Sequence, residues 1–168
     1  MSLLSVTIIL VVLAYLFFQA KSDAKTGYVY WLPNNILLTL FLILWIITVF
    51  YYLSFNAALS LLLETSALML VLYLSTRNLP FLGKVMQPAD AKAFSIVYFS
   101  SGISMSFIVS PLILLSTMFF CHITFIIWHR VVKKSEIGGR KPYFPFILVG
   151  YVLTIFLYII LYLTKLGI

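Results

Sequence analysis

A bundle of six transmembrane helices, in an all-α membrane protein, is the fold class that the sequence predicts. Of the 168 residues, 64% are hydrophobic and only 9% are charged, and the mean hydropathy is +1.15. A soluble domain of this length has too little interior to bury so much apolar surface. Because several packed spans form one bundle and leave no residues for a soluble module, we expect residues 1–168 to be a single polytopic membrane domain.

Six apolar runs are long enough to cross a bilayer, which takes roughly 20 residues and at least about 17. Two very short breaks, at 54–56 and 110–111, and three longer connections separate these runs. Each short break predicts a tight helical hairpin, and Pro111 suits the first turn of a helix. The predicted spans are 3–20, 35–53, 57–75, 93–109, 111–128 and 144–163.

The basic residues predict how the bundle is oriented. Ten of the eleven lysines and arginines fall in the connections 21–34, 76–92 and 129–143, and Lys165 is the exception. With six spans, these three connections lie on one side of the membrane. The positive-inside rule places them in the cytoplasm and both termini outside. We therefore attribute the net charge of +7 to topology and contact with the lipid bilayer, and expect no nucleic-acid partner.

Residues that could bind a metal are sparse. The single cysteine, Cys121, lies within an apolar run, which excludes a disulfide framework and a pair of cysteines for zinc. His122 and His129 are not spaced with carboxylates in a metal-binding pattern. We therefore expect neither a metal nor another cofactor.

The acidic residues are the strongest candidates for chemistry, and the chain has only four, namely Asp23, Glu64, Asp90 and Glu136. Asp23 and Asp90 fall near helix ends on the same predicted membrane face. Two carboxylates brought within a few ångströms share a proton, so that one acts as base and the other as acid. Such a pair can activate water against a peptide carbonyl and protonate the departing amine.

Each of these two acids also has a structural interpretation. Asp23 is flanked by Lys21 and Lys25, which would neutralise an acid at the membrane interface. Asp90 precedes an apolar run, and aspartate is favoured in the first turn of a helix. The spacing of the residues alone leaves these alternatives open.

Glu64 belongs to another part of the bundle. It lies about 10 Å deep from the outer side, at roughly 1.5 Å per residue, and a carboxylate there is costly unless it is protonated or hydrogen-bonded. We expect it to face the bundle interior, within reach of Ser104 and Ser106. A buried structural glutamate is one interpretation, and a small transporter or channel component that uses Glu64 is another.

Three blocks of sequence resemble the type IV prepilin peptidases, including the archaeal preflagellin peptidases, which are membrane-embedded aspartic proteases with a Gly-x-Gly-Asp signature. The blocks are Ser22-Asp23-Ala24-Lys25-Thr26 followed by Leu32-Pro33-Asn34-Asn35-Ile36-Leu37, then Ala89-Asp90-Ala91-Lys92-Ala93, and last the stretch from Lys141 to Gly150, which contains Pro142-Tyr143-Phe144-Pro145-Phe146. The resemblance implies that Asp23 and Asp90 are a catalytic pair. It also implies a prokaryotic inner-membrane location and a substrate with a basic leader followed by a hydrophobic N-terminal helix.

The chain departs from this family just before the second aspartate. Gln87-Pro88-Ala89 stands where the family has Gly-x-Gly, so that Gln87 and Ala89 replace both glycines and Pro88 stiffens the approach. The connection between Asp23 and Pro33 is also about three residues longer than is usual in the family. These departures keep a third interpretation open, a non-catalytic assembly protein that retains the peptidase fold.

Overall fold

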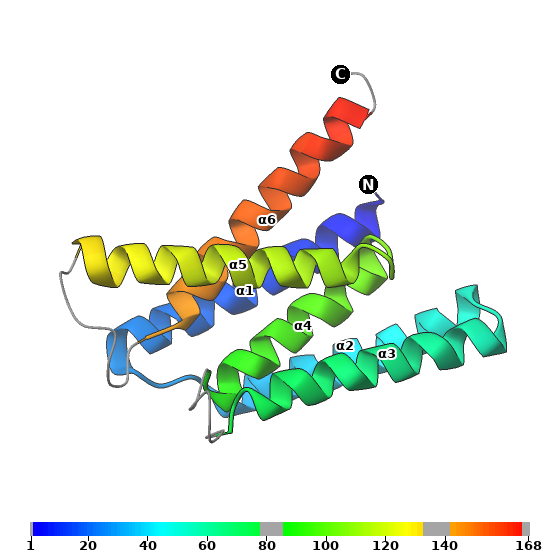
Figure 1. Cartoon of the computed structure of the whole chain (residues 1–168), viewed down its shortest axis with the longest axis horizontal. Helices are drawn as coiled ribbons and strands as arrows, with labels where there is room; N and C mark the ends of the chain where they lie inside the picture. The colour runs from blue at the N-terminus through cyan, green and yellow to red at the C-terminus, as the bar shows by residue number, and fades with distance from the viewer. Residues whose placement is uncertain (1, 78–85, 133–141, 166–168) are drawn as a thin grey trace.

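The computed structural model describes residues 2–77, 86–132 and 142–165, which fold into α-helices joined by short connections (Figure 1). Lys84, Glu136 and the basic residues of 133–141 lie outside the described residues, so the predictions about them stay predictions. In chain order the helices are α1 (Leu3–Thr26), α2 (Trp31–Tyr52), α3 (Phe55–Leu74), α4 (Pro88–Ser104), α5 (Ser110–Ile127), the π-helical turn η1 (Trp128–Val132) and α6 (Phe144–Lys165).

Five of these helices are long and apolar enough to cross a membrane, and α4 is the exception. It has 17 residues and begins five residues before the predicted span at 93–109, because Pro88 and Asp90 start the helix early. Residues 105–109 form the turn to α5 instead. The chain is therefore an all-helical protein with the features of a multi-pass membrane protein, and the sixth span and the outside location of the termini stay predictions.

The ends of the helices alternate between the two ends of the molecule. In Figure 1, α1, α3 and α5 end toward the same side on which α2, α4 and α6 begin. The N-terminus and the turns from α2 to α3 and from α4 to α5 lie toward the other side. This up-and-down course matches the predicted grouping of the long connections on one face. It also brings the C-terminal end of α1 and the N-terminal end of α4 to the same end of the bundle.

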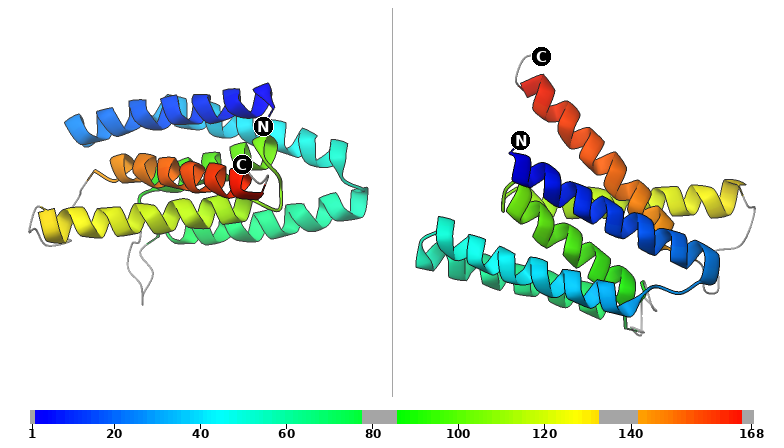
Figure 2. Two further views of the ribbon diagram at one scale, coloured as in Figure 1. Left: turned by 90° about the horizontal axis from the view of Figure 1, so that it is seen from above. Right: turned by 180° about the vertical axis from the view of Figure 1, so that it is seen from behind.

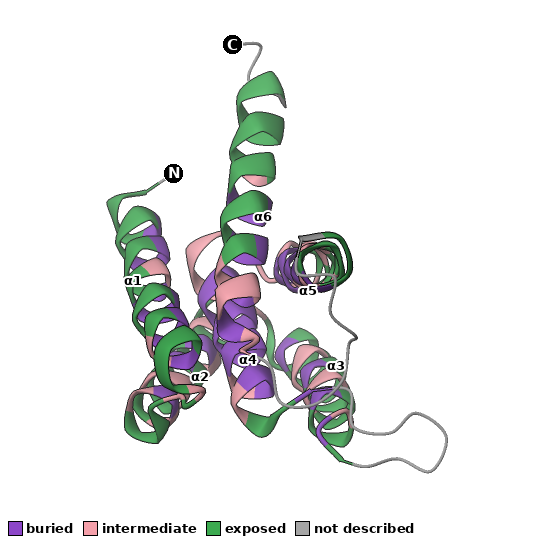
Figure 3. Ribbon diagram, turned by 90° about the vertical axis from the view of Figure 1, so that its left-hand side faces the viewer, coloured by how far each residue is buried: buried purple, intermediate pink, exposed green. Residues whose placement is uncertain are grey.

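Helix α4 forms the centre of the bundle and packs against α1, α2, α3, α5 and α6. Twelve of its 17 residues are buried, and in Figure 3 the buried colour is concentrated on this helix. Its buried hydroxyls are satisfied locally, since Ser100 and Ser101 each donate to a carbonyl three residues earlier. The least hydrophobic helix thus occupies the position that is most shielded from lipid.

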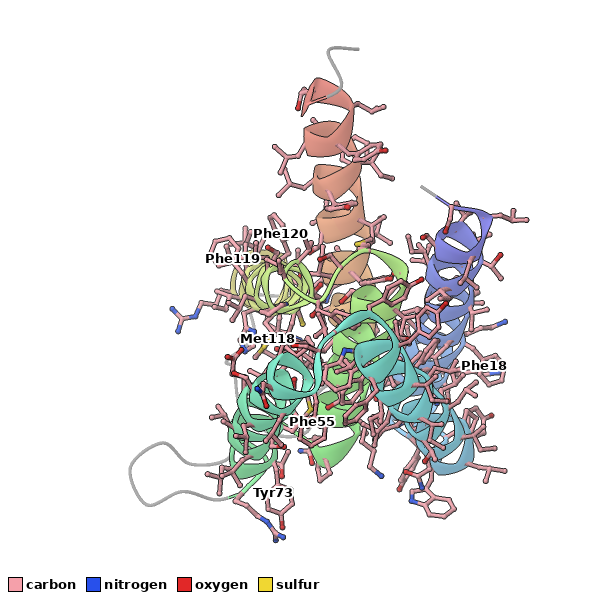
Figure 4. All side chains as sticks on the ribbon, turned by 90° about the vertical axis from the view of Figure 1, so that its right-hand side faces the viewer. Phe18, Phe55, Tyr73, Met118, Phe119 and Phe120 are labelled. Carbon is pink, nitrogen blue, oxygen red and sulfur yellow. The ribbon has the colours of Figure 1, made fainter. Side chains whose placement is uncertain are left out.

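The outer surfaces of the other helices are apolar, as a lipid environment requires. Exposed large hydrophobic side chains occur on α1, α2, α3, α5 and α6, and Figure 4 shows Phe18 and Phe119 projecting outward. The C-terminal half of α6 extends away from the bundle (Figure 3). Trp45, in contrast, is only 1% exposed and packs between Tyr98, Phe99 and Phe107.

Helices α5 and α6 approach each other closely at a glycine. A Cβ atom on Gly150 would lie 2.6 Å from the carbonyl oxygen of Thr117 and 2.8 Å from the backbone nitrogen of Cys121. Small residues permit this kind of backbone approach between helices in membranes. The close contact holds α6 against α5, and the start of α6 is part of the site described next.

Candidate active site

A cavity of about 310 Å³ lies where α1 ends and α4 begins. Both predicted catalytic acids, Asp23 and Asp90, line it, although 67 positions separate them in the sequence. Its volume is at the lower end of the range of roughly 300–1,000 Å³ that is typical of ligand pockets. The other lining residues are Gly27, Tyr28, Val29, Trp31, Asn34, Gln87, Pro88, Ala89, Lys92 and Tyr143.

Asp23 lies on a helix, because α1 continues for six residues beyond the predicted end at Ala20. Gly27 then ends the helix in the left-handed conformation, with φ of 68°, and donates its N–H to the carbonyl of Asp23 at 2.8 Å. Glycine adopts this conformation without steric cost. The extra turns carry the Asp23 side chain inward, and only 8% of it is exposed.

The Asp23 carboxylate caps the start of α6. Its Oδ2 accepts hydrogen bonds from the backbone N–H groups of Tyr143 at 2.7 Å and of Phe144 at 3.0 Å. The first N–H groups of a helix have no partner within the helix, and a negative charge there interacts favourably with the helix dipole. The interpretation that Lys21 and Lys25 neutralise Asp23 therefore missed its main partner. That partner is the backbone at the start of α6, beginning with Tyr143, 120 residues further along the chain.

Asp90 caps its own helix. It lies in the first turn of α4 and is 4% exposed. Its Oδ2 accepts from the Gln87 backbone N–H at 2.9 Å, and the Gln87 side chain in turn accepts from the backbone of Asp90. This reciprocal pair is a capping box, with Pro88 at the position where a missing N–H costs nothing. The structural interpretation of Asp90 is thus confirmed, and it is compatible with a second role in the cavity.

A buried hydrogen-bond network holds the wall of the cavity formed by the α1–α2 connection. Gln19, which is fully buried, accepts from the Tyr30 N–H at 3.0 Å and donates to the Tyr30 carbonyl at 3.0 Å. The same amide donates to Asn34 Oδ1 at 3.2 Å, and the hydroxyl of Tyr15 donates to that oxygen as well. Buried networks with satisfied partners rigidify the structure around them.

Two further groups border the cavity. Lys92 donates from Nζ to Asn35 Oδ1 at 2.6 Å, which ties α4 to the start of α2. The Tyr143 hydroxyl lies 3.1 Å from the imidazole of His122, on α5. Burial raises the pKa of Tyr143 well above its usual value, and Cys121 and Asp90 raise it further, so this hydroxyl stays protonated as a donor at neutral pH. His122 is thus a half-buried polar contact between α5 and the start of α6.

Glu64 does not face the bundle interior, and this prediction was wrong. Its side chain is exposed on α3, where Oε1 accepts a long hydrogen bond of 3.4 Å from Ser60. Together with Ser106 it lines a separate groove of about 800 Å³, to which neither Asp23 nor Asp90 contributes. The adjacent Thr65 is the residue that points inward, and its hydroxyl lies 2.9 Å from that of Tyr98.

No metal-binding group of three or more His, Cys, Asp or Glu side chains is present in the described part of the chain. Gln19, which holds the α1–α2 wall of the cavity, was not singled out from the sequence, and Asn34 and Tyr143 were named there only as parts of the resembling blocks. The signal for Gln19 was its amide in an otherwise apolar span, since polar groups in such spans seek partners within the protein.

Comparison of the chain with protein-family models, with curated proteins and with solved structures found no match.

Proposed function

We propose that the protein is an aspartic endopeptidase of the membrane that removes the N-terminal leader from type IV prepilin-like or preflagellin-like precursors, with Asp23 and Asp90 as its catalytic pair. One observation supports this proposal most directly. Two buried carboxylates on helices far apart in sequence line the same cavity at one end of the bundle. The resemblance of the surrounding sequence to the prepilin peptidases supports it independently.

The proposed chemistry needs only water and the two carboxylates. One aspartate removes a proton from water, whose oxygen attacks the peptide carbonyl carbon. The other aspartate donates a proton to the amine nitrogen as the C–N bond breaks. In this scheme either aspartate can act as the base, with the other as the acid. The capping contacts keep Oδ2 of each side chain in a defined orientation during this exchange.

The rival with the most structural support is the non-catalytic assembly protein. Both aspartates cap helices, and capping alone explains why a folded bundle keeps acceptors at these two positions. The transporter interpretation has less support, because Glu64 is exposed on the least buried helix and its groove is separate from the aspartate cavity.

Substitution by asparagine separates catalysis from capping. An asparagine side chain keeps one oxygen that accepts from a backbone N–H, but it cannot exchange a proton. We would co-express the full chain with a precursor that has a basic leader and a hydrophobic helix, and follow leader removal by gel mobility and mass spectrometry. For Asp23→Asn and Asp90→Asn we expect cleavage to fall by about 10²–10⁴-fold, the usual contribution of a general acid or base.

Glu64→Gln is the matched control, since it removes a carboxylate of the same chain outside the cavity, and we expect cleavage at the wild-type rate. If folded Asp23→Asn or Asp90→Asn still cleaves like the wild type, the catalytic pair is wrong. If the wild type itself leaves a panel of such precursors intact, the assembly-protein interpretation replaces the peptidase.

A further inference from the structure

An apolar groove of about 670 Å³ lies beside the aspartate cavity, between α2, α3 and α4. Its walls come from Leu38 and Leu42 of α2 and from Met69 and Leu72 of α3, with Phe99 further along α4. The groove exists because α2 and α3 lie on either side of α4 and separate from their common turn, as Figure 2 shows. It is open rather than enclosed, so it communicates with the space that lipid would fill.

The groove and the aspartate cavity meet at the start of α4. Pro88 and Lys92 line both of them. Ala91 and Ser95, one turn apart on α4, form the floor beyond this junction. The Ser95 hydroxyl donates to the Ala91 carbonyl at 2.9 Å and contacts the Met69 sulfur at 3.3 Å, so it is satisfied within the protein. The floor is therefore lined by small side chains, which allow an apolar surface to approach α4 closely.

The charge of the lining residues changes along the path from the aspartate cavity to the groove. Acidic side chains line the aspartate cavity, whereas the groove beyond Lys92 is lined mainly by apolar residues, with Arg77 at its rim. Arg77 interacts with Tyr73, both by a hydrogen bond to its hydroxyl and across its ring with 4.9 Å to the centroid. Figure 4 shows Tyr73 at the end of α3. A ligand that is basic at one end and apolar at the other would match this order.

We propose that this groove holds the hydrophobic helix of the precursor while the scissile bond lies in the aspartate cavity, an inference that rests on the proposed peptidase function. The basic leader then lies on the acidic side of Lys92 and the apolar helix on the other. The helix reaches the groove sideways from the bilayer, with one face on α4 and the opposite face still in contact with lipid. Residues of α2 and α3 that line the groove become determinants of substrate affinity.

Cysteine cross-linking tests where the helix lies without requiring cleavage. Cys121, the single native cysteine, is replaced by serine, and Met69→Cys is introduced in the groove. The matched control is Leu115→Cys, a lipid-facing position of α5 that is 59% exposed. Asp23→Asn is added to keep the precursor intact, and the precursor has one cysteine in the second turn of its hydrophobic helix. Disulfides form only when Cβ atoms approach within roughly 3.5–4.5 Å.

We expect cross-linking at Met69→Cys to exceed that at Leu115→Cys at least about tenfold. Equal cross-linking at the two positions, or none at Met69→Cys, would overturn the groove assignment. Copurification of an anionic phospholipid with an uncross-linked protein would point to a lipid as the occupant instead. Because the assay reports docking only, its failure leaves the peptidase proposal to be judged by cleavage.

Kinetics provide the second readout. Leu42→Trp narrows the groove from a partly exposed position of α2, where a larger side chain can be accommodated. We expect KM for the precursor to rise about tenfold with kcat nearly unchanged, since the substitution removes binding that is equal in the ground and transition states. An unchanged KM would contradict the assignment even if cleavage itself is robust.

Discussion

Of the three helices that border the proposed substrate groove, α3 and α4 differ most clearly in how deeply they are buried and how many helices they contact. Helix α4 packs against all five other α-helices, and twelve of its 17 residues are buried. Helix α3 packs mainly on α4 and α2, and only Ala58, Thr65 and Leu72 of its 20 residues are buried. We infer that the two ends of the site differ in rigidity. Helices α1, α4 and α6 hold the carboxylates in place, whereas the weakly packed α3 forms a wall of the groove that can move when a ligand binds.

The largest effect on stability should come from the close contact that fixes α6. In Gly150→Ala the added Cβ meets the backbone of Thr117 and Cys121 rather than a flexible side chain. We expect the free energy of unfolding to fall by about 3 kcal/mol, the upper end of the usual cost of overpacking. Titration with SDS in detergent micelles would measure it. The control Val149→Ala, at an exposed neighbouring position, should change stability little.

Removal of the Asp23 side chain should have the next largest effect. Asp23→Ala leaves the N–H groups of Tyr143 and Phe144 without their acceptor. We expect a loss of about 2 kcal/mol in the same titration. Asp23→Asn retains an acceptor and should lose clearly less. If the two variants are equally unstable, the interaction depends on charge and not on the hydrogen bonds.

The buried network around Gln19 should contribute somewhat less. Gln19→Met has a similar volume but leaves the backbone groups of Tyr30 unsatisfied. We expect it to cost about 1.5 kcal/mol and to increase proteolysis within the α1–α2 connection. Ser22→Ala removes an exposed hydrogen bond to Tyr28 from the same helix and should have almost no effect. Equal losses in both variants would indicate that burial of the network is unimportant.

The smallest effect is expected on α3. Thr65→Val removes the hydroxyl contact with Tyr98, the buried polar link between α3 and α4. Interhelical hydrogen bonds of this type average about 0.6 kcal/mol in membrane proteins. Ser66→Ala, whose hydroxyl bonds only within its own helix, serves as the control. A loss for Thr65→Val as large as that for Asp23→Ala would contradict the contrast between the two helices.

Hydropathy located the helices well, because a long run of apolar residues marks the length of each span. It did not reveal which face of each helix points inward, since helices that are hydrophobic all round have no distinguishing stripe. For that reason Glu64 was expected in the interior, and this expectation was wrong. Asp90 followed from local capping rules, whereas the role of Asp23 depends on Tyr143 and Phe144, which no local pattern connects to it.

The bond between Asp23 and the start of α6 has an evolutionary consequence. Under the proposed function, selection for a correctly seated α6 and selection for catalysis would both act on this one side chain. A descendant that abandoned cleavage would still keep an oxygen acceptor at position 23, and asparagine or serine would serve there. The identity of residue 23 across natural variants of the chain therefore distinguishes the two roles. An invariant aspartate would indicate that the carboxylate is needed for catalysis, whereas replacement by asparagine would indicate that only the capping of α6 is needed.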